Sequence, residues 1–224
     1  MTASKLLSTA ACEVLGPLGA TQMGRSRTWL DDNRWWLGVI EFQPSSWGRG
    51  SYLNVGVDWL WTPKDYLSFD FGGRVDVPGG GEFLEYESEE QFAPLARKLA
   101  GAAAEQMLHY RELFPTIEAT AATLRKRDPE QSLLESLDTG IALGLVGDDK
   151  GARRMFARSI DYFESGEESE WRTDNDQALY DRVRSLSEVV HDRARFRRRI
   201  RDDVKQARTQ LKLDPDIELP FSPR

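Results

Sequence analysis

The sequence predicts an α+β fold: an antiparallel, Trp-rich sheet of four or five strands, covered by helices and followed by an all-helical C-terminal extension. Six of the seven tryptophans fall between residues 29 and 61, where apolar and polar residues alternate as they do in strands. From residue 88 almost to the end of the chain, apolar residues recur instead at the spacings of three and four typical of helices. We therefore expect a sheet domain at residues 1–127 and a helical extension at residues 128–224.

The first predicted element is an amphipathic helix. Its apolar positions are Leu6, Leu7, Ala10, Val14 and Leu15. The apolar stretch before Cys12 is six residues long, shorter than the about 7 to 15 residues of an export signal. The chain contains no run of about 18 apolar residues. We therefore expect a cytoplasmic protein that does not enter a membrane.

The strands of the sheet domain are predicted from alternation and from turn residues. Residues 25–30 and 35–42 form a hairpin across a polar turn, and a longer turn leads into a strand at residues 51–61. Residues 66–71 resume the strand pattern, and residues 82–86 are a candidate edge strand. In the third strand, alternation predicts one face with Leu53, Val55, Val57, Trp59 and Trp61, and a second face with Tyr52, Asn54, Gly56, Asp58 and Leu60.

Helices complete the sheet domain and form the extension. Ser88 with Glu90 and Gln91 predicts a helix start with a capping box. The extension then consists of a helical hairpin at residues 132–145 and 149–163, an acidic connector, a long Arg-rich segment of one or two helices at 177–211, and a tail with three prolines. The hairpin resembles a single tetratricopeptide-like unit, which favours a helical surface for a protein partner.

The charge and the rare residues exclude several classes of function. The net charge is −7, and residues 1–92 contain 7 Lys and Arg against 13 Asp and Glu, which does not suit binding to a phosphate backbone. One cysteine and two histidines exclude a cysteine-based zinc site and a multi-histidine centre. The glycines at 79–81 lack the lysine of a phosphate-binding loop. We therefore predict no catalytic residue, no cofactor and no metal ligand.

Polar residues on neighbouring strands form the first candidate site. Glu41, Gln43 and Asn54 are predicted to make a polar recognition patch beside Trp35 and Trp47. The alternative is that the two amides only hydrogen-bond the backbone of the turn, as buried amides usually do.

Carboxylates on the strands form a second candidate. Glu41, Asp58 and Asp70 could converge on the polar face of the sheet and bind a divalent cation or act in acid–base chemistry. The alternative is that they are solvated acids, because their spacing matches no metal-binding motif.

An arginine-rich helix is the third candidate. Six arginines lie in nine residues: Arg193, Arg195, Arg197, Arg198, Arg199 and Arg201. Among them, Arg197, Arg198 and Arg201 cluster on one side of the helix and could contact nucleic acid or an acidic partner. The alternative is that they pair with acids of the same chain. The opposite side has an apolar stripe of Phe196, Ile200 and Val204 directed at a partner helix.

Three motifs resemble an uncharacterised bacterial family known as domain of unknown function 4304. They are GRSRTW at residues 24–29, IEFQPS at 40–45 and YLNVGV at 52–57, together with the helix pair ending near Leu113-Phe114-Pro115. The resemblance covers roughly residues 10–127, and the chain departs from the family at Leu18-Gly19-Ala20, where Gly-Phe is usual. The resemblance implies the sheet fold and names no catalytic residue.

We therefore predict a non-enzymatic protein-binding or adaptor module whose C-terminal helices engage another protein, in a hetero-complex or a homo-oligomer. The family resemblance associates it with bacterial toxin immunity or phage defence. Two alternatives stay open: a nucleic-acid-associated protein that uses the arginines of residues 193–201, and a metal-dependent enzyme that uses the sheet carboxylates.

Overall fold

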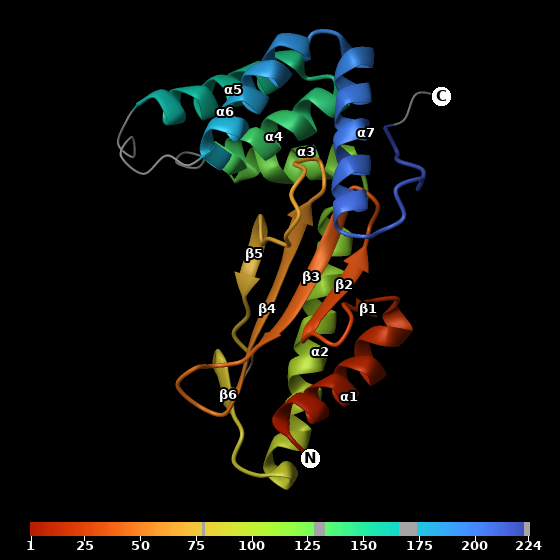
Figure 1. Ribbon diagram of the computed structural model, residues 1–224, viewed down its shortest axis with the longest axis vertical. Helices are drawn as coiled ribbons and strands as arrows, with labels where there is room; N and C mark the ends of the chain where they lie inside the picture. The colour runs from red at the N-terminus through yellow and green to blue at the C-terminus, as the bar shows by residue number, and fades with distance from the viewer. Residues whose placement is uncertain (78, 128–132, 166–173, 222–224) are drawn as a thin grey trace. The chain divides into compact units, whose positions relative to one another are not determined.

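The computed structural model describes residues 1–77, 79–127, 133–165 and 174–221. The chain divides into two units, the first of Met1–Trp59 with Tyr66–Glu112, and the second of Leu60–Asp65 with the described chain from Leu113 onward. The first unit contains an antiparallel sheet and the second contains five helices among its described residues (Figure 1). The predicted α+β class is confirmed. Within the described ranges, no helix has the length and apolar character needed to cross a bilayer.

The sheet of the first unit is antiparallel throughout. Its strands are β1 (Thr21–Gln22), β2 (Thr28–Asp32), β3 (Trp36–Gln43), β4 (Gly50–Trp59), β5 (Phe71–Arg74) and β6 (Phe83–Glu85). They lie in the order β1-β2-β3-β4-β5, and β6 also pairs with β4. Along β4, residues 54–57 pair with β5 and residues 50–52 pair with β6, so these two short strands follow one another along β4.

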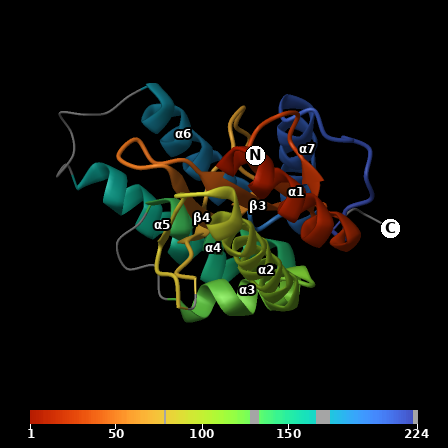
Figure 2. The same cartoon turned by 90° about the horizontal axis from the view of Figure 1, so that it is seen from below.

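The two faces of β4 differ as the alternation predicts. Val55 and Val57 are fully buried on the face that the helix α2 (Glu89–Leu113) covers. The Tyr110 hydroxyl of α2 donates a hydrogen bond to the Val55 carbonyl at 3.2 Å, and its ring meets the Phe71 ring edge-on at 5.8 Å. Figures 1 and 2 show α2 running along this face of the sheet. Asn54 and its neighbours therefore occupy the opposite face.

The first helix, α1 (Ala3–Leu15), is amphipathic as predicted. Its buried side chains are Leu6, Leu7, Ala10, Ala11 and Leu15. The helix α2 begins as predicted, because the Ser88 hydroxyl accepts a hydrogen bond from the Gln91 amide at 3.2 Å. The Gln91 side chain does not close the capping box, since its oxygen accepts from the Glu87 amide instead.

An ion pair joins α2 to the sheet. Asp31 of β2 is 2% exposed, and its two carboxylate oxygens accept hydrogen bonds from Arg111 at 2.9 and 2.6 Å. Arg111 also donates to the Leu18 carbonyl at 2.8 Å, and the bonds to Asp31 raise the pKa of its guanidinium. Asp31 faces Gly38 on β3, where a Cβ atom would lie 3.0 Å from the Asp31 Cβ. Gly38 has no side chain, so it leaves room for the Asp31 carboxylate that binds Arg111.

One predicted strand is wrong. Residues 66–70 form a loop, and the strand begins only at Phe71. The loop is held by Ser68, whose hydroxyl donates to Asp70 at 2.7 Å and to Asp58 at 3.3 Å. Phe69 of this loop lies over Gly56, where a Cβ atom would come within 2.7 Å of the ring. Of the alternating Leu67, Phe69 and Phe71, only Phe71 therefore belongs to a paired strand, and Phe69 packs from the loop over Gly56.

The second unit is built around one central helix. Its helices are α3 (Ile117–Lys126), α4 (Leu133–Val146), α5 (Asp149–Glu164), α6 (Asp174–Val189) and α7 (Arg193–Gln210). The helix α4 packs against α3, α5 and α7, and all of its residues from 136 to 145 are buried. The predicted hairpin of α4 and α5 is confirmed, and the Arg-rich segment forms two helices.

The apolar stripe of α7 has its partner within this unit. Phe196, Ile200 and Val204 are fully buried. The Phe196 ring lies against Gly144 of α4, so closely that a Cβ atom at Gly144 would come within 2.6 Å of it. The predicted partner helix of this stripe is therefore α4 of the same unit, and the stripe is not available to another protein.

We predict opposite effects for two Gly→Ala substitutions within helices. Gly101→Ala in α2 meets no atom within 4 Å, so helix propensity should raise the free energy of unfolding by about 0.5 to 1 kcal/mol. Gly144→Ala in α4 gains the same helix propensity, but its methyl group would clash with the Phe196 ring. This substitution should therefore lower the free energy of unfolding by about 1 to 2 kcal/mol. Urea denaturation of both variants measures the difference. Stabilisation by Gly144→Ala would contradict the packing of α4 against α7.

Candidate functional site

Five side chains gather on the face of the sheet opposite α2. We call this set the polar row: Glu41, Gln43, Tyr52, Asn54 and Arg74. The β3–β4 register places Glu41 opposite Asn54 and Gln43 opposite Tyr52, and the β4–β5 register places Asn54 opposite Arg74. Directly opposed residues of antiparallel strands point to the same face, so three strands together build the row.

Asn54 is the centre of the polar row. It is 8% exposed, and its amide nitrogen donates to the Glu41 carboxylate at 2.8 Å and to the Gln43 side-chain oxygen at 3.0 Å. Its amide oxygen accepts a hydrogen bond from Arg74 Nε at 2.7 Å. Arg74 Nη2 also donates to Gln43 at 2.8 Å. These bonds join side chains to side chains, so the prediction that the two amides serve only the turn backbone does not describe them.

Aromatic side chains continue the row toward the β3–β4 loop. The Arg74 guanidinium lies 3.9 Å from the centre of the Tyr52 ring, a close cation–π contact. The Tyr52 and Phe83 rings lie 4.9 Å apart, and a Cβ atom at Gly48 in the loop would lie 3.5 Å from the Phe83 ring. The loop residue next to Gly48 is Trp47.

Trp47 is 96% exposed, a rare state for the largest apolar side chain. Large exposed aromatic side chains are typical of interaction sites when they adjoin other such groups. Trp35 does not belong to this site. It is buried in the β2–β3 turn, next to the start of β3, whereas Trp47 follows the end of β3. Of the two predicted tryptophans, only Trp47 therefore lies at the end of β3 that carries Gln43, in the loop that follows the strand.

The structure adds two members to the predicted patch. Tyr52 could have been found, because alternation places it on the same face as Asn54. Arg74 could not be found, since its strand was expected to end at Phe71 and the arginine lies three residues beyond. With Arg74 included, the row combines one anion, one cation, two amides and a phenol. Such a set can bind polar and charged groups of a partner while Trp47 supplies apolar area.

The sheet carboxylates do not converge. Asp58 and Asp70 meet at Ser68, and Asp70 also accepts the Trp59 amide at 2.8 Å. Glu41 pairs with Asn54, four residues along β4 from Asp58, which corresponds to about 13 Å along the strand. No group of three or more His, Cys, Asp or Glu suited to a metal ion occurs in the described ranges. Asp58 and Asp70 are therefore the acceptors that hold the loop after β4.

The arginines of α7 divide into engaged and exposed residues. Arg197 donates to the Leu145 carbonyl at the end of α4 at 3.0 Å, and burial lowers the pKa of its guanidinium. Arg201 pairs with Asp202 at 3.2 Å, and Arg198 is exposed without an ion pair to a described residue. The three residues predicted to share one surface therefore have three different environments.

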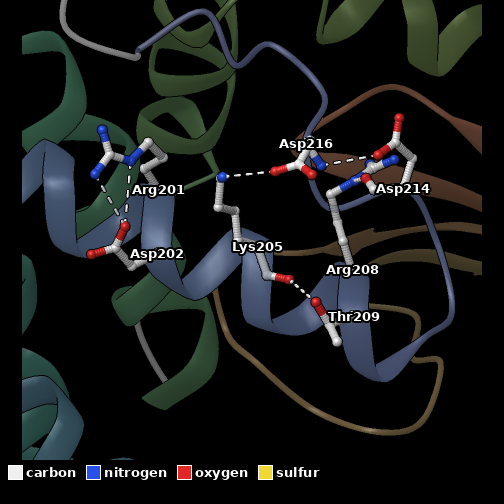
Figure 3. Close-up of polar contacts among 7 residues, drawn as sticks. All are labelled: Arg201, Asp202, Lys205, Arg208, Thr209, Asp214 and Asp216. Atoms are coloured by element: carbon white, nitrogen blue, oxygen red, sulfur yellow. Dashed lines mark hydrogen bonds and ion pairs between the residues drawn. The ribbon is translucent and has the colours of Figure 1, made fainter.

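The C-terminal half of α7 is engaged in the same way. Lys205 donates to Asp216 at 3.1 Å, and Arg208 donates to the Asp214 carbonyl. Both acceptors lie in the segment that follows the helix (Figure 3). Arg208 is only 1% exposed. Lys205 and Arg208 therefore hold the chain after α7.

A buried ionic cluster lies elsewhere in the second unit. Arg182 of α6 pairs with Asp203 of α7 at 3.0 Å and also donates to the Trp61 carbonyl. The Trp61 indole donates to Asp138 of α4 at 2.9 Å. Burial lowers the pKa of Arg182 and raises the pKa of Asp203, so desolvation outweighs their attraction. The cluster joins α4, α6 and α7 and is best explained as a structural one.

Comparison with protein-family models, with curated proteins and with solved structures finds no match to this chain. Its function is therefore argued from the side chains themselves. Among the three predicted candidates, only the patch around Asn54 is brought together as a set.

We predict a contrast in stability between two neighbouring arginines of α7. Arg197→Met removes the cation that binds a carbonyl at the end of α4 and should lower the free energy of unfolding by about 1 to 2 kcal/mol. Arg198→Met is the matched control and should change it by less than about 0.5 kcal/mol. Thermal and urea denaturation measure both values. Equal effects would contradict the capping role of Arg197.

Proposed function

We propose that this protein is a non-enzymatic, protein-binding module and that the polar row with Trp47 is its binding surface. The observation that supports the proposal most is the 96% exposure of Trp47 beside an organised row of polar side chains. Trp, Tyr and Arg are the residues most enriched at the energetic centres of protein interfaces. Here all three occur within or next to one surface.

The side chains of the polar row are fixed before binding, which favours binding of a partner. Asn54, Gln43 and Arg74 already hold one another through hydrogen bonds of 2.7 to 3.0 Å. Side chains that are fixed before binding lose less conformational entropy on binding. Trp47 supplies apolar area, and burial of a tryptophan removes about 150 to 250 Å² from water. Glu41 and Arg74 can supply charge complementarity at the rim.

The alternatives have weaker support. Binding of nucleic acid through α7 would need free cations, whereas Arg193, Arg197, Arg199 and Arg201 all have partners within the chain. A metal-dependent enzyme would need the three sheet carboxylates to meet, and Glu41 lies apart from the other two. We further propose a cytoplasmic protein whose partner is a second protein or a second copy. The family resemblance supports a bacterial setting in toxin immunity or phage defence.

We predict that Trp47→Ala abolishes capture of the partner. The tagged chain is used in pull-downs from its native host with and without nuclease, so that contacts through nucleic acid are recognised by their loss. Loss of an interface tryptophan should weaken the isolated complex by about 30-fold or more, the value of an interface hot spot of about 2 kcal/mol.

Tyr66→Ala is the matched control, because Tyr66 is another exposed aromatic residue of the same unit, outside the polar row. It should leave the stoichiometric partner bound. A partner that Trp47→Ala retains, or that both variants lose equally, would contradict this location. Partners that disappear with nuclease would favour the arginine helix instead.

A further inference from the structure

A second surface of the first unit has the chemistry of an anion site. A pocket of about 260 Å³ lies between the first turns of α1 and the chain around β1 and β2. Its lining includes three cations, Lys5, Arg25 and Arg27, together with the hydroxyl groups of Ser4, Ser8 and Ser26. Its lining contains no acidic residue.

The pocket is positively charged, although the part of the chain that forms it has a net negative charge. Residues 1–92 are net acidic, yet none of the three cations forms an ion pair with an acid in the described part of the chain. Three like charges around one small volume repel one another, and low-dielectric walls increase that repulsion. An anion in the pocket would convert this repulsion into attraction.

Arg27 is the least exposed of the three cations. Its Nε donates to the Ser4 hydroxyl at 3.2 Å, whereas its Nη1 is buried and has no hydrogen-bond partner among the described residues. Buried donors are almost always satisfied, and those of a charged group cost most when they are not. An anion in the pocket would offset the cost of this buried charge by electrostatic attraction.

The start of α1 adds to the positive potential. Thr2, Ser4 and Lys5 belong to the cap and first turn of this 13-residue helix, and all three line the pocket. The first amides of a helix have no intrahelical acceptor and attract anions. The apolar Leu7, Trp29 and Phe42 line another part of the pocket and leave room for a small organic group.

We propose that this pocket binds the phosphate group of a small phosphate monoester. Lys5, Arg25 and Arg27 neutralise the dianion, and the serine hydroxyls donate to its oxygens. A phosphate fits better than a carboxylate, because it has two charges and three free oxygens for three cations and several donors. The site is separate from the polar row, since Phe42 alternates with Glu41 and Gln43 and therefore faces the other side of the sheet.

The test is isothermal titration with phenyl phosphate, with benzoate at equal ionic strength as the probe of carboxylate binding. We expect saturable binding of phenyl phosphate, competition by inorganic phosphate, and binding of benzoate at least about tenfold weaker. Lys5→Met with Arg25→Met changes only exposed residues and should weaken binding about tenfold or more. Arg27→Met should have a similar effect, with its fold checked by circular dichroism.

Two control variants make the outcome decisive. Arg97→Met removes an exposed arginine of α2 outside the pocket and should not change binding. Trp47→Ala should also leave it unchanged, which separates this site from the proposed protein-binding surface. Absence of saturable binding, equal affinity for benzoate, or an equal effect of Arg97→Met would overturn the proposal. So would tighter binding of a twelve-residue oligothymidylate that the Lys5 and Arg25 substitutions abolish.

Discussion

The alternation of β4 is the constraint on which the first unit depends. Every second side chain of this central strand is buried on the side of α2, so the residues between them must occupy the other face. A shift of one residue in its pairing would bury Asn54 beneath the helix and turn Val55 outward. The position of α2 is secured by Arg111 and Asp31, whose two hydrogen bonds join the helix to β2.

This arrangement gives the first unit two different surfaces. One face of the sheet presents the polar row beside an exposed tryptophan, which suits a protein partner. The other side, between α1 and the chain around β1 and β2, concentrates cations around a small pocket. Occupancy of that pocket by a phosphorylated molecule would stabilise the start of α1 and the chain around Arg27. The second unit, in contrast, uses most of the arginines of α7 to hold its own helices and the segment after them.

Much of the fold could be predicted because local patterns and tertiary contacts agree. The register that places Asn54 beside Glu41 follows from the alternation of two strands with a well-defined turn, and Ser88 caps its helix by local geometry. The loop at residues 66–70 could not be predicted, because Phe69 packs over Gly56 and hydrogen bonds from Ser68 compete with strand pairing. Without the correct limits of β5, Arg74 could not be assigned to the polar row.

The pocket proposed to bind phosphate has no sequence signature for a similar reason. Its cations come from α1 and from the chain after β1, and nothing in their spacing shows that they share a volume. The apolar stripe of α7 illustrates the opposite case. Its periodicity was predicted correctly, but only packing decides that Phe196 meets Gly144 of the same chain and not another protein.

The central claim is that the surface around Trp47 binds a protein, and photocrosslinking tests it most directly. A photoreactive benzoylphenylalanine replaces Trp47 in the full chain, and a second chain has it in place of the exposed Leu108 of α2. Irradiation in the native host should give one discrete adduct from position 47 and none of that mass from position 108. No adduct from position 47, or the same adduct from both positions, would contradict the proposed surface.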